Sequence, residues 1–384
     1  MNLEINESIA ENRIPEGIQK LKLEENLFIW GSNYADKIIN EIEKYDVKVD
    51  GIVGNIDFLK SNLQETIFCE TEVRAKRSRI SIIVGFSWSK NLTLLADLCN
   101  DDLINHIYIL EGAEYAWRMM YDQEVKLFKH QKMIFIDSYY KGLLKRGLDY
   151  NYYKANEEKF VETFQMLEDE LSKETMIQYL NGHIKLSTFP MEKVRDNSPQ
   201  YYNKDIIKLS DEEVFVDCGA FDGDSILQFV QETSGKYKKI IALEPDEKML
   251  EKLYDNISNL EKTRVLKVGA YNQAGKIGFS AENCGTISSQ NIDYYINVDM
   301  LDNVIPEENV TFLKMDIEGA ELSALEGAQK IIRKNRPTLA ICVYHKAEDL
   351  ITIPQFIKNL VPEYKLYLRG YFDYCSEVVL YAVL

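Results

Sequence analysis

The chain has 384 residues, of which 46% are hydrophobic and 28% charged, with only 8 prolines. This composition is typical of a globular protein long enough for two domains, and it excludes a disordered chain. The net charge of −17 argues against nucleic acid and anionic lipid as partners, because both require a basic surface.

Targeting signals and disulfides are also not indicated. No apolar run is long enough to cross a bilayer, and the N-terminal segment is charged rather than signal-like. The 6 cysteines are scattered without a Cys-x-x-Cys pair, so we expect reduced thiols. The sequence therefore predicts a cytoplasmic protein without stable membrane insertion.

The first half of the chain predicts a small α/β domain after a polar N-terminal arm, residues 1–26. Buried strands alternate with helices over residues 27–112, which is typical of a parallel, Rossmann-like sheet. The strands are expected at 27–31, 47–54, 80–86 and 106–112, and the helices at 34–45 and 92–100. The first turn, Gly31 to Asp36, has one glycine where a dinucleotide site needs three. This favours a structural or partner-binding domain over a nucleotide site.

Residues 113–205 are rich in Tyr and Phe and poor in Gly. Apolar positions at helical spacing predict helices over 157–184, with a break near Ser172 and Thr175 and a stop at Gly182. We interpret this region as a helical linker that covers part of a site in residues 206–384.

From residue 206 onward the alternation of strands and helices returns. We expect parallel strands at 214–217, 239–243, 264–271, 310–315 and 338–345, helices at 225–230, 248–260, 321–337 and 353–361, and a closing pair at 364–372 and 377–384. Two successive strands without a helix between them predict an antiparallel pair at the sheet edge.

The most informative stretch is Val214 to Ser225, VFVDCGAFDGDS. A buried strand ends at Asp217, and Gly219 and Gly223 form a turn where a ligand can approach the backbone. Glu244 ends the next strand about 20 residues later, where an acid grips ribose hydroxyls. Together these features predict a nucleoside site.

The acids around the turn indicate which nucleoside binds. Asp217, Asp222 and Asp224 would repel a pyrophosphate but suit a cation, and S-adenosylmethionine carries a sulfonium and an ammonium group. The alternative is an ordinary strand–turn–helix corner with solvated aspartates.

This half of the chain resembles the FkbM family of class I S-adenosylmethionine-dependent methyltransferases. The resemblance rests on Asp217 to Ser225, on Glu244-Pro245-Asp246 and above all on Lys314 to Glu321, KMDIEGAE. It implies an O-methyltransferase that acts on a sugar or glycan precursor in a surface-polysaccharide or natural-product pathway. The residues expected to bind the donor are Asp217, Gly219, Ala220, Phe221, Gly223, Asp224, Ser225, Glu244, Pro245, Ala270, Tyr271, Asn272 and Asp316.

The acceptor hydroxyl must lose its proton, so a base is expected at the carboxyl end of the sheet. His345 follows the fifth strand and, with an unperturbed pKa, would suit proton removal at neutral pH. Asp316 and Glu318 are the other candidates, and Asp316 could instead orient the methionine ammonium. Glu318, Tyr344, Arg369 and Tyr371 are expected to face the acceptor.

Several alternatives stay open. Asp316, Glu318 and His345 could together bind a divalent metal, although we favour a metal-free site because the acids are not spaced as a known metal cage. The chain could also be a nicotinamide-dependent oxidoreductase, against which both turns lack Gly-x-Gly-x-x-Gly, or a scaffold with a vestigial donor site. A homodimer is compatible with the sequence.

Overall fold

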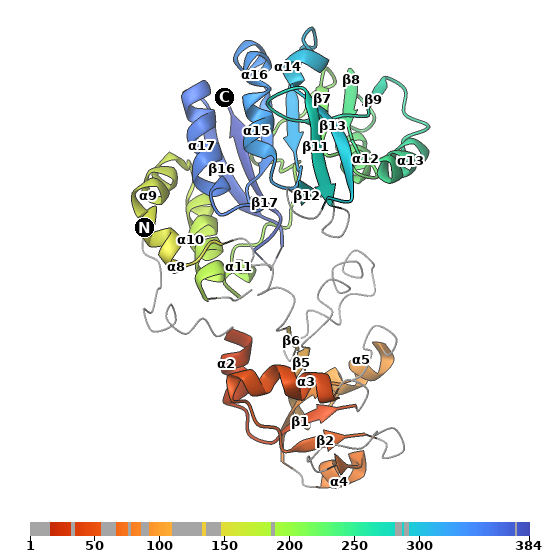
Figure 1. The fold of residues 1–384 in the computed structure, drawn as a ribbon, viewed down its shortest axis with the longest axis vertical. Helices are drawn as coiled ribbons and strands as arrows, with labels where there is room; N and C mark the ends of the chain where they lie inside the picture. The colour runs from red at the N-terminus through yellow and green to blue at the C-terminus, as the bar shows by residue number, and fades with distance from the viewer. Residues whose placement is uncertain are drawn as a thin grey trace. The chain divides into compact units, whose positions relative to one another are not determined.

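The computed structural model describes residues 16–31, 35–54, 67–75, 78–85, 92–109, 133–135, 147–185, 189–280, 286–287, 292–372 and 375–384. Contacts divide the chain into two compact units, one within residues 5–145 and 183–187, the other within residues 146–182 and 188–384. Each unit has its own parallel-rich sheet (Figure 1).

The N-terminal unit contains a six-stranded parallel sheet in the order β3-β2-β1-β4-β5-β6. Its strands are β1 (Leu27–Trp30), β2 (Gly51–Val53), β3 (Ile67–Phe68), β4 (Ile80–Val84), β5 (Ile104–Ile109) and β6 (Met133–Phe135). Its helices are α2 (Glu16–Lys22), α3 (Ala35–Ile42), the 3-10 helix η1 (Glu43–Tyr45), α4 (Glu70–Ala75) and α5 (Leu92–Asn100). Every residue of β1 and β4 is buried, as central strands of a parallel sheet must be. The predicted Rossmann-like fold is confirmed, and the short elements β3, α4 and β6 are additions.

The strand order of this sheet reverses between β1 and β4, which is where doubly wound sheets bind nucleotides. The glycines that follow the two strands touch, because a Cβ on Gly85 would lie 2.2 Å from the carbonyl oxygen of Gly31. Residues 32–34 and 86–91, which come next, lie outside the described residues. The turn predicted at Gly31 to Asp36 is therefore described only in part.

The C-terminal unit contains a seven-stranded sheet in the order β16-β17-β15-β14-β7-β8-β9. Its strands are β7 (Val214–Cys218), β8 (Lys239–Leu243), β9 (Thr263–Leu266), β14 (Phe312–Met315), β15 (Thr338–Cys342), β16 (Lys365–Gly370) and β17 (Val378–Val383). Neighbouring strands are parallel except around β17, which runs antiparallel between β15 and β16. The predicted closing antiparallel pair is confirmed.

Helices cover both faces of this sheet. They are α12 (Asp224–Glu232), α13 (Glu247–Asn256), α14 (Leu301–Val304), α15 (Glu321–Glu326), α16 (Gln329–Asn335) and α17 (Asp349–Leu360). The strand order runs in opposite directions from the centre, and parallel strands are joined by right-handed crossovers, so α12 and α13 lie on one face and α15 to α17 on the other (Figure 1). The predicted single helix 321–337 is two helices, interrupted at Gly327, where a Cβ would lie 2.0 Å from the carbonyl oxygen of Tyr271.

A small second sheet lies between α13 and β14 in the chain. Its strands are β10 (Gly269–Ala270), β11 (Gly275–Ser280), β12 (Thr286–Ile287) and β13 (Tyr294–Asp299), in the order β10-β13-β11-β12. The predicted strand 264–271 is too long, because β9 ends at Leu266 and Gly269 pairs with Val298 of this second sheet.

The helices predicted over 157–184 are present but divided elsewhere. They belong to a set of four, α8 (Tyr150–Ala155), α9 (Glu157–Met166), α10 (Glu170–Lys185) and α11 (Phe189–Glu192). The break precedes α10, where the Asp169 carboxylate accepts a hydrogen bond of 2.8 Å from the Ser172 amide and caps the helix. The predicted break at Ser172 and Thr175 and the stop at Gly182 are therefore wrong.

Residues from the predicted linker cover the edge strand β16. The amide of Glu168 donates to the carbonyl of Leu366 at 2.9 Å, and the amide of Asp196 donates to the carbonyl of Gly370 at 2.8 Å. These bonds satisfy main-chain groups that an edge strand would otherwise expose. The segment before the sheet is thus built into the C-terminal unit.

An aromatic cluster fixes the same segment against strands β7 and β14. The rings of Phe215, Phe229 and Phe312 are fully buried, with 4.5 Å between the centroids of Phe215 and Phe229. Tyr202, which precedes the sheet, packs 5.8 Å from Phe312, and its hydroxyl donates to the carbonyl of Ser225 at 2.7 Å. None of the described helices is long and apolar enough to cross a membrane.

Candidate functional site

The turn after β7 adopts the backbone conformation that its glycines predict. Gly219, Phe221 and Gly223 have φ angles of 79°, 48° and 91°. A Cβ on Gly219 would lie 2.0 Å from the carbonyl oxygen of Asp316. Only glycine fits there, and the turn is therefore held directly beside the residue that follows β14.

Asp217 shapes this turn instead of facing its open side. Its carboxylate is fully buried, lies 2.9 Å from the Lys314 ammonium and accepts a hydrogen bond from the Ser225 hydroxyl. Burial alone would lower the pKa of Lys314, but Asp217 and Asp316 raise it above its usual value, so the lysine stays charged. Lys314 also donates to the carbonyl of Gly219 at 2.8 Å. Of the three carboxylates expected to attract a cation, Asp217 is thus already paired with a lysine, while Asp222 is half-buried and Asp224 is exposed.

Glu244 is held in one orientation at the end of β8. Its two oxygens accept hydrogen bonds of 2.9 Å each from the main-chain amides of Phe221 and Asp246. Burial raises the pKa of Glu244 to about 7, and the two amides oppose that rise. Each carboxylate oxygen keeps a second acceptor position, so the group can still bind a pair of hydroxyls.

The residues expected to border adenine do not directly follow strand β9, which ends at Leu266, and their contact with adenine stays a prediction. Ala270 is buried in β10, the amide of Tyr271 donates to the carbonyl of Asp299 at 2.9 Å, and Asn272 donates to Glu326 at 2.9 Å. The segment that directly follows β9 is 267–269. Gly269 lies beside Pro245, since a Cβ on that glycine would be 3.6 Å from the proline ring.

Asp316 is the meeting point of three parts of the chain. Its Oδ2 accepts a hydrogen bond of 2.8 Å from the Tyr201 hydroxyl, and its Oδ1 accepts one of 3.3 Å from Tyr344. The side chain remains 24% exposed. Burial would raise the pKa of Asp316, but His345 and Lys314 lower it below its usual value, so the carboxylate is ionised at neutral pH.

His345 lies among carboxylates. Its Nδ1 is 2.9 Å from Glu321, and its Nε2 is 3.5 Å from Asp316 and 3.6 Å from Glu318. Burial alone would lower the pKa of His345, but the charge and hydrogen bond of Glu321 and the two other acids raise it to about 10. The expected unperturbed pKa is therefore wrong. At neutral pH the ring is an imidazolium, which has no lone pair with which to take a proton.

Glu318 has the properties that were expected of the histidine. Its side chain is 34% exposed, and its backbone has a φ of 56°. Burial raises its pKa to about 7, which His345 partly offsets and Asp316 reinforces. Glu318 therefore exchanges a proton near neutral pH.

Three residues around these side chains have strained backbone conformations. Tyr201, Glu318 and Glu377 have φ angles of 67°, 56° and 53°, a region that residues with a Cβ seldom adopt. Each of the three contacts Asp316, His345 or Tyr344. Strain of this kind persists where the surrounding structure imposes it, and it marks functional sites.

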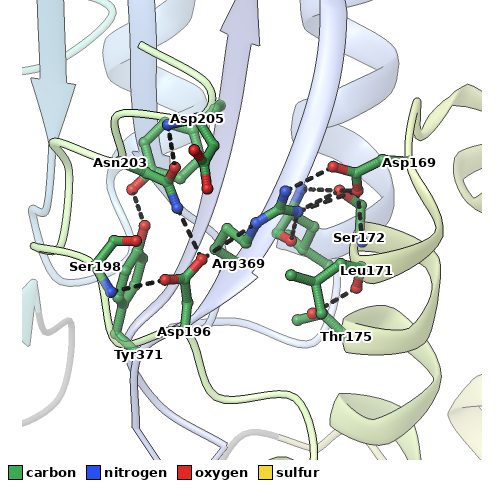
Figure 2. Close-up of polar contacts among 12 residues, drawn as sticks. Asp169, Leu171, Ser172, Thr175, Asp196, Ser198, Asn203, Asp205, Arg369 and Tyr371 are labelled. Carbon is green, nitrogen blue, oxygen red and sulfur yellow. Dashed lines mark hydrogen bonds and ion pairs between the residues drawn. The ribbon is translucent and has the colours of Figure 1, made fainter.

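Arg369 and Tyr371 face the interior (Figure 2). Arg369 is 5% exposed and forms ion pairs with Asp169 at 2.6 Å and with Asp196 at 3.3 Å. The Tyr371 hydroxyl bonds that of Tyr381 at 2.5 Å. Arg369 thus holds two preceding segments against β16, and the predicted contact of Arg369 and Tyr371 with an acceptor stays a prediction.

The geometry also bears on the metal alternative. Asp316, Glu321 and His345 each offer one atom within 4.8 Å of the others, close enough to surround an ion. However, Glu321 already lies at the Nδ1 nitrogen of the ring, while Asp316 lies at Nε2, so one ring nitrogen does not face both acids. The metal-free site stays a prediction.

Comparison with known proteins agrees with this geometry. Residues 217–370 match the family model described as the methyltransferase FkbM domain. This part of the C-terminal unit is therefore similar to the FkbM methyltransferases. The predicted resemblance to this family is thereby confirmed for that part of the chain.

Solved structures extend the likeness in fold to the whole chain. Methyltransferase FkbM from Methylobacillus flagellatus KT has 22% sequence identity and a TM-score of 0.62, with 98% of this chain and 96% of that chain covered. An rRNA methylase from Streptococcus thermophilus has 20% identity and a TM-score of 0.31, with 45% of this chain and 87% of that chain covered. Fibrillarin from Aeropyrum pernix, in complex with S-adenosyl-L-methionine, has 14% identity and a TM-score of 0.29, with 47% and 71% covered. No curated protein sequence matches this chain.

Sequence reasoning found the strand ends of the FkbM domain but missed several side chains that complete the site. The fold brings together Asp316, Glu318, Tyr344 and His345, all predicted, with Tyr201, Lys314, Glu321 and Glu377, to which no role was given. Lys314 and Glu321 lie inside the KMDIEGAE motif. A lysine within a buried strand and a glutamate at the start of the next helix could have indicated that both side chains have charged partners in the site. Tyr201 and Glu377 gave no such signal.

Proposed function

We propose that this protein is an S-adenosylmethionine-dependent O-methyltransferase that acts in the cytoplasm on a hydroxyl of a sugar or glycan precursor. The main support for this proposal is the glycine turn, which packs against Asp316 and has the fixed carboxylate of Glu244 at the end of the adjacent strand. The methyltransferase FkbM domain found over these residues supports methyl transfer.

The donor fits the residues around the turn. No side chain fits at Gly219, so the backbone of Gly219 to Gly223 would hold the methionine part at close range. Glu244 would accept hydrogen bonds from both ribose hydroxyls, and the ionised Asp316 would pair with the ammonium group. When bound, the donor supplies an activated methyl group, and positioning then supplies much of the rate.

Glu318 would act as the base for the acceptor hydroxyl. It is partly exposed beside Asp316, and its pKa of about 7 lets it hold the hydroxyl proton at neutral pH. His345, kept cationic by Glu321, would then stabilise the charges of Glu318 and Asp316. The Tyr344 hydroxyl, which bonds Asp316 and Glu377, would offer a hydrogen bond to a sugar oxygen at the same place.

Replacing Glu244 with Ala tests the donor site. We expect calorimetry to show binding of S-adenosylhomocysteine to the wild-type protein, weakened by about 2–4 kcal/mol in the variant because both ribose contacts to a charged group are lost. Glu363→Ala, which removes an exposed carboxylate distant in sequence from the turn, is the matched control. Unchanged affinity in Glu244→Ala would remove the ribose assignment, and heat with NAD(H) but none with S-adenosylhomocysteine would favour an oxidoreductase.

A further inference from the structure

Tyr201 lies outside the matched FkbM residues, yet its hydroxyl reaches the centre of the site. It donates to Asp316 Oδ2 at 2.8 Å, and its ring lies 5.2 Å from the Lys314 ammonium. The residue is 7% exposed. A side chain from the segment before the sheet is therefore part of the surroundings of Asp316.

The hydroxyl of Tyr201 fixes which way Asp316 faces. Oδ2 accepts a hydrogen bond from Tyr201, while Oδ1 accepts one of 3.3 Å from Tyr344 and lies 3.5 Å from the imidazolium of His345. Without the Tyr201 bond, the remaining contacts would draw the carboxylate toward Tyr344 and His345. Tyr201 thus opposes the attraction of His345 and keeps Asp316 available to a second cation.

Tyr201 is itself held rigidly. Its amide donates to the Tyr381 hydroxyl at 3.0 Å, and the next residue, Tyr202, is anchored in the aromatic cluster. The φ of 67° shows that these contacts impose a conformation that the residue would not adopt alone.

Arg369 anchors the segment that carries Tyr201 (Figure 2). It pairs with Asp196, which in turn accepts a hydrogen bond of 2.7 Å from Asn203, so both ends of residues 196–203 are fixed to one side chain. Asp169 and Ser172 of the α10 N-terminus bind the other side of the guanidinium, at 2.6 Å and 2.8 Å.

We propose that Tyr201 is a positioning residue that orients Asp316 toward the amino-acid part of the methyl donor. The Arg369–Asp196 contact holds the segment that places Tyr201 there. The inference rests on the proposed function and adds a residue that the FkbM match does not include. It predicts that the loss of the hydroxyl affects only ligands that carry the amino-acid group.

The test compares two ligands on the full chain. S-adenosylhomocysteine carries the amino-acid group, whereas 5′-methylthioadenosine has the same adenosine without it. Calorimetry on Tyr201→Phe should show affinity for the first reduced about fivefold to tenfold, through the loss of a hydrogen bond to a charged group, and affinity for the second unchanged. Tyr364→Phe is the matched control, because it removes a buried hydroxyl that bonds only the Pro337 carbonyl among its described partners, at 2.5 Å.

Each other outcome decides against the inference. Equal loss of both ligands in Tyr201→Phe would show a merely structural role, and wild-type affinity for both would show no role. A selective loss in Tyr364→Phe of the same size would also overturn it. If the wild-type protein bound neither ligand, the proposal that S-adenosylmethionine is the donor would be wrong, and so would the inference that rests on it.

Discussion

The charge on His345 is set by Glu321, Glu318 and Asp316, which the fold brings around its ring. A histidine after a buried strand is an attractive base in isolation, because its usual pKa is close to neutral. Here the surrounding acids raise that pKa to about 10, while burial among like charges raises that of Glu318 to about 7. These opposite shifts are the reason why Glu318, and not His345, is the base that we propose.

Glu318→Gln should lower turnover by about 10² to 10⁴-fold with little change in donor affinity, because a general base is lost. A carboxylate acts as a base only above its pKa, so wild-type turnover should rise as the pH passes through about 7. The Gln variant should lack that rise, which a pH–rate profile measures. Normal turnover in Glu318→Gln, together with loss of the pH-dependent rise in His345→Gln, would instead make His345 the base.

At the scale of elements, the edge strand β16 joins helices and sheet into one unit. Main-chain bonds from Glu168 and Asp196 cover the strand, and the Arg369 side chain on it pairs with Asp169 and Asp196. This arrangement explains why a segment that the sequence suggests is a linker packs as part of the C-terminal unit.

Arg369→Met should lower the free energy of unfolding by about 2–4 kcal/mol, because Asp196, which is only 12% exposed, would lose its cation. Denaturant unfolding followed by circular dichroism measures this loss. Arg336→Met is the matched control, since Arg336 and Glu363 are both exposed and such pairs contribute little. An equal, small effect of the two substitutions would contradict the anchoring role of Arg369.

At the scale of the whole molecule, the boundaries of the C-terminal unit differ from those of the domain match. The match begins at residue 217, whereas the compact unit also contains residues 146–182 and 188–216. The N-terminal unit has a separate parallel sheet with the strand order of nucleotide-binding folds.

A chain of residues 146–384 should therefore unfold cooperatively and bind S-adenosylhomocysteine. A chain of residues 206–384 should be less stable and aggregate, because it lacks both the cover of β16 and Tyr201. Size-exclusion chromatography and denaturant unfolding of the two chains make the comparison. Equal stability of the two chains would show that residues 146–205 do not stabilise the sheet.

The sequence by itself determined the two α/β sheets, the glycine turn at Gly219, the acid at Glu244 and the resemblance of the C-terminal half to the FkbM family. These features are local, because strand periodicity, turn glycines and motif spacing depend on residues that are close together in the sequence. Only the tertiary structure decided that Asp217 pairs with Lys314, that His345 is cationic, and that Tyr201 bonds Asp316 from 115 residues away in the chain. A pKa and a hydrogen-bond partner depend on which distant groups the fold buries together, and no spacing along the chain records that.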